Sequence, residues 1–232
     1  MLFRSRTATY PSDPPAASAH EFAHVIPMKS GVPAVRGLAR AAITLDGAAC
    51  ERLVADAIER RGVVWTWEQV LVPVLERVGD RWARDGRGID VEHVLSSAIE
   101  SVFVAQVRRL DSPLNPRPLL LAAAEDEQHV LPLWAVAAAL AERHVGCQML
   151  GARVPFDTLV NAARRTGPPA IFLWAQVPVV SKIDQLNELN KLRPAASVVV
   201  GGPGWPTNLS VSLAQVSDLT EATARLSRAV GL

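Results

Sequence analysis

Between residues 35 and 111, hydrophobic side chains recur at spacings of three and four, the period of helices that bury one face. The pattern predicts a short helix over Val35–Ala42 and a second helix that Asp46 caps and Gly62 ends. The second helix is expected to bury Leu53, Val54, Ala57 and Ile58.

Two more helices follow before residue 111. Thr66 and Gln69 have the spacing of a capping box, so the third helix is expected to begin at Thr66. Pro73 removes a hydrogen bond to the carbonyl of Gln69 and should bend this helix. After a turn at residues 85–88, Asp90 is expected to cap a fourth helix. That helix should bury Val91, Val94, Leu95, Ala98, Val102 and Ala105. Four helices with short connections predict an antiparallel four-helix bundle over residues 35–111.

The pattern changes after residues 111–117, which contain two prolines and are expected to link two domains. Short apolar runs now alternate with helical patterns. The expected strands are 118–124, 145–150, 170–174 and 196–200, and the expected helices are 133–143, 156–165, 183–191 and 219–230. This alternation predicts a flavodoxin-like, doubly wound parallel sheet over residues 117–232, giving an α plus α/β chain. Ligands of such sheets bind beyond the carboxyl ends of the strands.

Composition narrows the class of protein. Residues 1–34 are rich in proline and have no apolar period, so we expect a mobile tail, or alternatively a docking peptide. The formal net charge of +1 gives no overall field to attract nucleic acid or an anionic membrane. Two cysteines cannot form a disulfide framework, and the longest apolar stretch, residues 131–140, is about half of a membrane span. We expect a cytoplasmic protein.

His129 is the first candidate for chemistry, because it lies in an acidic loop after the first expected strand. A neutral imidazole binds a metal through one nitrogen, and the carboxylate of Glu127 can accept a hydrogen bond from the other. The alternative is a surface histidine. No zinc spacing, nucleophile elbow or paired carboxylates beyond this acidic loop support a hydrolytic or redox enzyme.

Two further groups have both a functional and a structural interpretation. Trp82, Glu92 and His93 are expected to meet at one end of the bundle, where the tryptophan alternatively plugs the end. The glycines of residues 201–204 allow a ligand to approach the backbone closely, or they form a tight turn. Trp134, Trp174 and Trp205 are expected to line a pocket or to lie in the core.

Together these residues resemble the cobalamin-binding module of light-responsive regulators of the CarH/LitR type, which are MerR-family transcription factors. The segment from Trp82 to Glu92 and His93 matches their W-x9-E-H signature. Glu127 and His129 match E-x-H, Leu150-Gly151 matches an L-G segment, and Val200-Gly201-Gly202 matches a G-G segment. The resemblance covers residues 35–232.

The resemblance implies adenosylcobalamin as the cofactor and His129 as the lower cobalt ligand, in place of the cofactor's own base. It implies that Trp82 and Glu92 hold the adenosyl group, with His93 beside them. Gly201 and Gly202 would let the nucleotide tail run against the backbone. Light would break the cobalt–carbon bond.

Three positions depart from the family pattern. Ala83 stands where the family has a histidine, Pro132 where it has a glycine, and Trp174-Ala175 where it has a small hydroxyl residue. Trp174 is expected to obstruct the space for the tail.

No helix-turn-helix fits the residues before the bundle, so direct binding of nucleic acid is not expected. We expect a sensory protein that acts through a DNA-binding partner or as a homo-oligomer, unless the given start lies inside a longer gene. The alternatives are a corrinoid methyl carrier and a cofactor-free interaction module.

Overall fold

The computed structural model describes residues 33–85, 88–179, 186–189, 191–206 and 213–232. The chain divides into two compact units. One comprises Met1–Arg61 and Trp65–Val102, and the other comprises Gly62–Val64 and Phe103–Leu232. The expected tail falls outside the described residues as far as residue 32, while Pro33 already belongs to the first described helix.

The first two described helices are those that the sequence predicts. Helix α2 covers Pro33–Ile43 and helix α3 covers Gly47–Arg61. Asp46 caps α3 through its Oδ1 atom, which accepts a hydrogen bond from the Ala49 amide at 2.8 Å. Gly62 follows α3 with a φ of +80°, a backbone conformation that glycine adopts without strain. Polar capping and a terminal glycine are local signals, so they are readable from sequence.

The predicted capping box at Thr66 is wrong. Helical backbone already begins at α4 (Val63–Thr66) and continues through a π-helical turn, η1 (Trp67–Leu71), into α5 (Val72–Asp85). Thr66 has helical angles and its side chain caps nothing. The π turn directly precedes Pro73, and the Val72 amide bonds the Trp67 carbonyl five residues back. A wider turn accommodates a proline that cannot donate a hydrogen bond.

Helix α6 covers Ile89–Arg108, and Asp90 lies inside its first turn, so the predicted cap at Asp90 is also wrong. The helix begins one residue earlier because the Gly88 carbonyl accepts from the Glu92 amide at 2.9 Å. The buried stripe differs from the expected one toward the end of the helix. The buried residues are Val91, Leu95, Ala98, Ile99 and Phe103, whereas Val94 and Val102 are half-buried and Ala105 is exposed.

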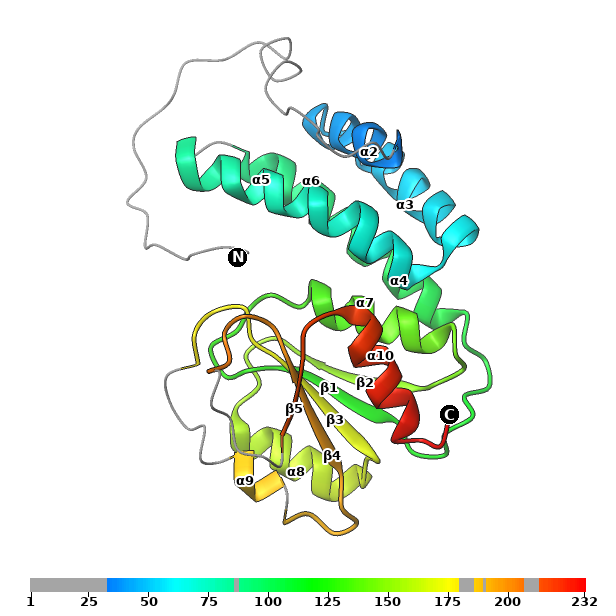
Figure 1. The fold of residues 1–232 in the computed structure, drawn as a ribbon, viewed down its shortest axis with the longest axis vertical. Coiled ribbons are helices and arrows are strands. Elements are labelled where there is room, and N and C mark those ends of the chain that lie inside the picture. The colour runs from blue at the N-terminus through cyan, green and yellow to red at the C-terminus, as the bar shows by residue number, and fades with distance from the viewer. Residues whose placement is uncertain (1–32, 86–87, 180–185, 190, 207–212) are drawn as a thin grey trace. The chain divides into compact units, whose positions relative to one another are not determined.

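The second unit contains a five-stranded parallel sheet in the order β2-β1-β3-β4-β5, which confirms the predicted fold class (Figure 1). The strands are β1 (Leu119–Ala123), β2 (Cys147–Gly151), β3 (Ala170–Trp174), β4 (Ser197–Gly201) and β5 (Ala214–Val216). The helices are α7 (Leu131–Ala141), α8 (Phe156–Thr166), α9 (Leu186–Leu189) and α10 (Leu219–Arg228). Strand β5 was not expected, because three residues are too few for an alternating pattern.

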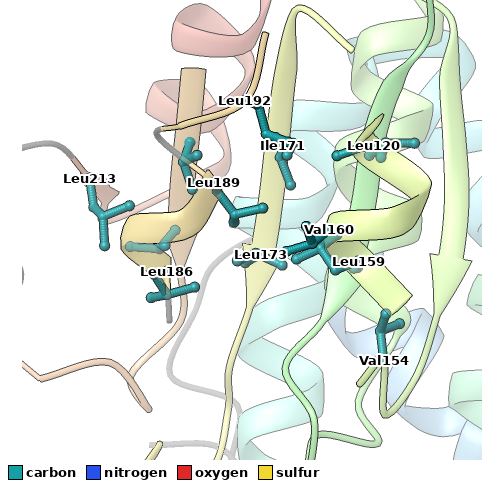
Figure 2. Close-up of a cluster of buried hydrophobic side chains, with 14 of the residues drawn as sticks. Leu120, Val154, Leu159, Val160, Ile171, Leu173, Leu186, Leu189, Leu192 and Leu213 are labelled. Atoms are coloured by element: carbon teal, nitrogen blue, oxygen red, sulfur yellow. The ribbon is translucent and has the colours of Figure 1, made fainter. Parts of the chain in front are cut away.

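Helices cover both faces of this sheet. Leu159 of α8 and Leu189 of α9 pack around Ile171 and Leu173 of β3 on one face (Figure 2). Side chains alternate along a strand, so Phe172 points to the opposite face, which α7 and α10 cover. Helix α7 is apolar and buried almost all round, which explains the long apolar stretch in the sequence. Within the described residues, no helix is long and apolar enough to span a membrane.

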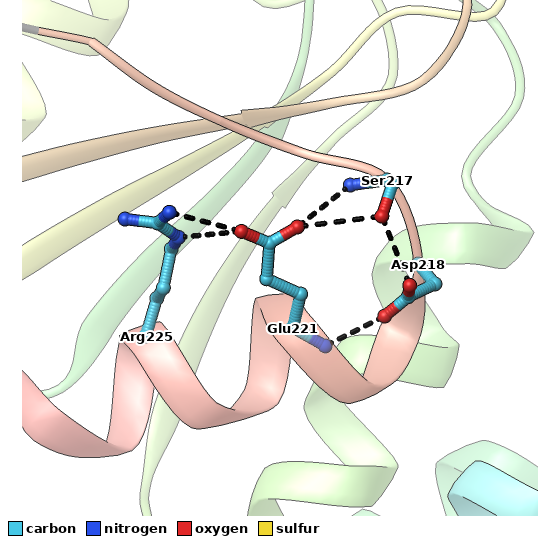
Figure 3. Close-up of polar contacts among 4 residues, drawn as sticks. All are labelled: Ser217, Asp218, Glu221 and Arg225. Atoms are coloured by element: carbon cyan, nitrogen blue, oxygen red, sulfur yellow. Dashed lines mark hydrogen bonds and ion pairs between the residues drawn. The ribbon is translucent and has the colours of Figure 1, made fainter.

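A polar cluster fixes the start of α10 (Figure 3). Asp218 caps the helix by accepting a hydrogen bond from the Glu221 amide at 2.7 Å. The Glu221 carboxylate accepts from the Ser217 amide at 3.1 Å and pairs with Arg225 at 2.9 Å. The Ser217 bond and then the Arg225 bond hold the pKa of Glu221 below its usual value.

Candidate functional site

The loop after β1 is organised around one buried carboxylate. Glu127 is 1% exposed, and its amide bonds the Ala124 carbonyl at 2.9 Å in a turn that follows the strand. Its Oε1 atom accepts from the His129 amide at 2.7 Å and lies 2.5 Å from His129 Nδ1. Its Oε2 atom accepts from the amides of Gln176 and Val177. The pairing of Glu127 with His129 agrees with the arrangement predicted from their spacing.

The contacts of Glu127 join the loops after three strands. Gln176 and Val177 follow β3, nearly fifty residues away in sequence, and the Glu127 carbonyl also accepts from the Arg153 amide after β2 at 2.8 Å. Loops at the carboxyl edge of a parallel sheet leave amides without ladder partners, and an ionised carboxylate is a strong acceptor for them. Glu127 therefore fixes the positions of these loops relative to His129.

Electrostatics favour the ionised form of Glu127. Burial raises its pKa, but the hydrogen bonds from His129, Val177 and Gln176 outweigh burial, so the pKa lies below its usual value. A carboxylate at Nδ1 favours the tautomer with the proton on Nδ1. A metal would then bind His129 through Nε2, and the His129 side chain is 35% exposed.

The described residues contain no group of three or more His, Cys, Asp and Glu side chains that could hold a metal ion. A single imidazole can still ligate a metal that a macrocycle holds, as one histidine does for the iron of a haem.

The glycines after β4 are packed against the protein itself. Gly201 pairs with Trp174 of β3, and a Cβ atom on Gly201 would lie 2.8 Å from Phe172 Cζ. Gly202 has a φ of +101°, and a Cβ atom there would collide with the Ala175 carbonyl. The glycines thus permit close packing of the chain's own residues.

The aromatic residues near this edge have different environments. Trp205 is buried, and its Nε1 atom donates to the Gly201 carbonyl at 2.9 Å, so it stabilises the glycine loop. Trp174 is half-buried, and its Nε1 atom is buried without a hydrogen-bond partner. Trp134 is half-buried on α7. Of these three tryptophans, Trp174 is the one whose indole N–H is buried without a hydrogen-bond acceptor.

A cleft with about 630 Å³ of space, counting its open mouth, lies at the carboxyl ends of β1 and β3. Leu159, Leu173 and Trp205 of its wall belong to the cluster on the α8 and α9 face. Its acidic lining residues are Glu125, Asp126 and Glu127. The cleft lies at the edge where the sequence places ligands, and Trp205 lines it, as one of the two expectations for this residue holds. Its walls from α8 and the loop after β3 were not predicted, because they come from segments that are distant in the chain.

The other predicted residues lie as follows. Gly151 ends β2 with a φ of +91° and has open space where a Cβ atom would lie. Pro132 occupies the first turn of α7, a position that suits proline.

In the helical unit, Glu92 is half-buried and accepts from Ser96 Oγ at 2.8 Å, while His93 is exposed. Trp82 lies in α5, and its side chain is outside the described part of the chain.

Comparison with known proteins shows what this chain is similar to. Residues 34–105 match the family model of the B12 binding domain. The structure is similar to that of the monomethylamine corrinoid protein of Methanosarcina barkeri, with a TM-score of 0.63 and 16% sequence identity. That match covers 82% of this chain and 96% of the other, and at this identity it shows the fold alone. Residues 34–105 thus resemble the B12 binding domain, and the fold is that of a corrinoid protein.

In sequence, the chain is similar to the HTH-type transcriptional repressor CarH of Myxococcus xanthus. It is 32% identical over 147 residues, which is 60% of this chain and 45% of CarH. The chain therefore spans less than half the length of this curated relative. The match confirms the resemblance to the cobalamin-binding module of CarH-type regulators, and with the domain match it supports corrinoid binding.

Proposed function

We propose that this chain is a cobalamin-binding sensory protein in which His129 would hold the cobalt. The observation that carries the proposal is the pair of Glu127 and His129, in which a buried carboxylate orients an imidazole at the ligand edge of the sheet. The B12 binding domain match over residues 34–105 and the likeness to CarH support the same cofactor.

The residues fit the cobalt of cobalamin better than they fit its nucleotide tail. The oriented imidazole suits a metal that lacks one axial ligand. The glycine loop gives less support, because the space beside Gly201 contains the ring of Phe172 and the indole of Trp174. Adenosylcobalamin, when bound, supplies a cobalt–carbon bond that light breaks. By resemblance, Trp82 and Glu92 hold the adenosyl group, with His93 beside them.

Within the sheet unit, Glu127 has two tasks in this mechanism. It holds the proton on Nδ1 of His129, so that Nε2 is the ligating atom. It also connects His129 to the amides of Gln176 and Val177, so a change at the imidazole would reach the loop after β3 through this carboxylate. Differential contacts of this kind are what a ligand-dependent switch requires. We propose that the output passes to a DNA-binding protein partner or to another copy of the chain.

Absorption spectroscopy tests the cofactor and its ligand. The protein is incubated with adenosylcobalamin in the dark, desalted, and measured before and after green light. We expect retained cobalamin and a spectral change on illumination. Failure to retain any cobalamin would refute the proposal, and retention without a light response would favour a methyl carrier.

Two histidine variants make the test specific. His129→Asn should lower retention at least tenfold and change the spectrum of any cobalamin that remains. His144→Asn is the matched control, because His144 is exposed in the same unit and its φ of +57° is one that asparagine tolerates. Equal retention by both variants would exclude His129 as the ligand.

A cofactor-free interaction module is the second candidate function. The observation that favours it is the aromatic packing beside Gly201, which fills space that a ligand would need. The same desalting experiment separates the two, because a module without a cofactor stays colourless.

A further inference from the structure

We propose that this chain binds the corrin ring of its ligand while the nucleotide tail stays in solvent. The chain then accepts corrinoids that lack a nucleotide, such as cobinamide, as well as complete cobalamin. The inference rests on the proposed function, since it concerns which corrinoids the same site takes. It follows from the packing around the glycine loop.

On the face of the sheet covered by α7 and α10, aromatic rings occupy the space beside Gly201 of β4. Phe172 is 2% exposed, and its ring atoms lie 2.8 and 3.1 Å from the point where a Cβ atom on Gly201 would be. The Trp174 ring lies 3.5 Å from the same point. A flat nucleotide base needs a space as wide as an aromatic ring, and here two aromatic rings already occupy it.

The next glycines provide no alternative route for a tail. A Cβ atom on Gly202 would collide with the Ala175 carbonyl, and one on Gly204 would collide with the Val177 carbonyl. The loop is also bonded to its neighbour, since the Gly204 amide donates to the Ala175 carbonyl at 2.9 Å. The loops after β3 and β4 therefore close on each other.

The cleft on the other face is unsuited to the tail for an electrostatic reason. The nucleotide tail of cobalamin contains an anionic phosphodiester. The acidic residues Glu125, Asp126 and Glu127 line the cleft. Like charges in a partly desolvated cleft repel, so this cleft disfavours the phosphate. In the part of the chain that the structure describes, the rings beside Gly201 and the acidic lining of the cleft therefore both disfavour the tail.

Trp174 is the weaker part of the packing beside Gly201. Its Nε1 atom is buried without a partner, whereas Phe172 buries no polar atom. A buried donor without an acceptor destabilises the packed arrangement. Substitution of Trp174 is therefore the change that opens this space with the least damage to the core.

The experiment compares two corrinoids on the wild-type chain. Hydroxocobalamin and diaquacobinamide are each titrated and followed by absorption and by tryptophan fluorescence. Cobinamide has no benzimidazole to compete with His129 for cobalt, so we expect it to bind as tightly as cobalamin, within threefold, or more tightly. Cobalamin binding more than threefold tighter would overturn the inference while leaving the proposed function intact. Binding of neither corrinoid would overturn both.

A variant tests the assigned cause. Trp174→Ser removes one of the two rings, and we expect it to shift the ratio of the two dissociation constants at least threefold in favour of cobalamin. Trp65→Ser, which removes a half-buried indole from the helical unit, should leave the ratio unchanged. An unchanged ratio in Trp174→Ser would overturn the role of Trp174.

Discussion

The loops after β1 and β4 lie at the same edge of one sheet, yet they are built in opposite ways. The first surrounds the ionised, buried carboxylate of Glu127, which collects backbone amides and orients a half-exposed imidazole. The second has no such group and is packed with the aromatic rings of Phe172 and Trp174. The comparison teaches that two loops at one edge of a sheet can be held by separate interactions, one by a buried carboxylate and the other by aromatic packing.

The largest expected effect comes from breaking the polar loop. Glu127→Ala would leave the buried amides of Gln176 and Val177 without their acceptor, so we expect a loss of about 3 kcal/mol in the free energy of unfolding. Denaturant unfolding measures it. Asp126→Ala is the control, because Asp126 is exposed and should change stability by less than about 0.5 kcal/mol. A loss below about 1 kcal/mol for Glu127→Ala would contradict this account of the loop.

A pair of glycine variants tests the packed loop after β4. The pair separates the cost of a positive φ from the cost of a collision with the neighbouring backbone. Gly202→Ala meets both a positive φ and a collision with the Ala175 carbonyl, whereas Gly151→Ala meets a positive φ in open space. We expect a loss of about 1 kcal/mol for Gly151→Ala and of about 2 kcal/mol for Gly202→Ala. Thermal and denaturant unfolding of both variants measure the difference. Equal losses would mean that the loops after β3 and β4 separate readily.

The cap of α10 provides a polar cluster outside both loops for comparison (Figure 3). Asp218→Ala removes the side-chain acceptor of the Glu221 amide, so we expect a loss of about 1 kcal/mol. This loss should be smaller than that of Glu127→Ala, because water can replace the cap at an exposed helix end. Unfolding in denaturant tests the ranking, and a reversed order would contradict it.

The smallest expected effect concerns pH and sharpens the contrast between buried and exposed carboxylates. The pKa of Glu221 is lowered in the folded state, so its ionised form contributes stability above the usual pKa of 4.5, and this contribution is lost as pH falls through the lowered value. Because Glu221 is partly exposed, we expect less than about 1 kcal/mol.

The check is the difference in stability between the wild type and Glu221→Gln at neutral pH and in acid. The difference should disappear in acid and shrink in high salt. A difference that persists in acid would show that the carboxylate acts through packing rather than charge.

Much of the fold could be predicted because its signals are local. The limits of β3 and the cap of α3 by Asp46 agree with the pattern of residues. The capping box at Thr66 failed because a π turn before Pro73 lets helical backbone begin earlier. The cap at Asp90 failed because the amide of Glu92 bonds the backbone of Gly88. In both cases backbone geometry outweighed a side-chain signal.

The candidate site was predictable only in part. Glu127 and His129 are two residues apart, so their pairing follows from chain geometry within one loop. The bonds from Glu127 to Gln176 and Val177 join residues about fifty positions apart, and no local pattern indicates them. No local pattern indicates that Phe172 occupies the space beside Gly201 either, since this contact depends on the pairing of β3 with β4.

The sequence by itself determined the alternation of strands and helices, the polar loop after β1, and the likeness to cobalamin-binding regulators. These depend on periodicity, caps and short motifs, which act over a few residues. The tertiary structure decided which amides Glu127 binds and whether the glycines face a ligand or the protein. Those outcomes depend on strand order and register, which bring together side chains that are far apart in the chain.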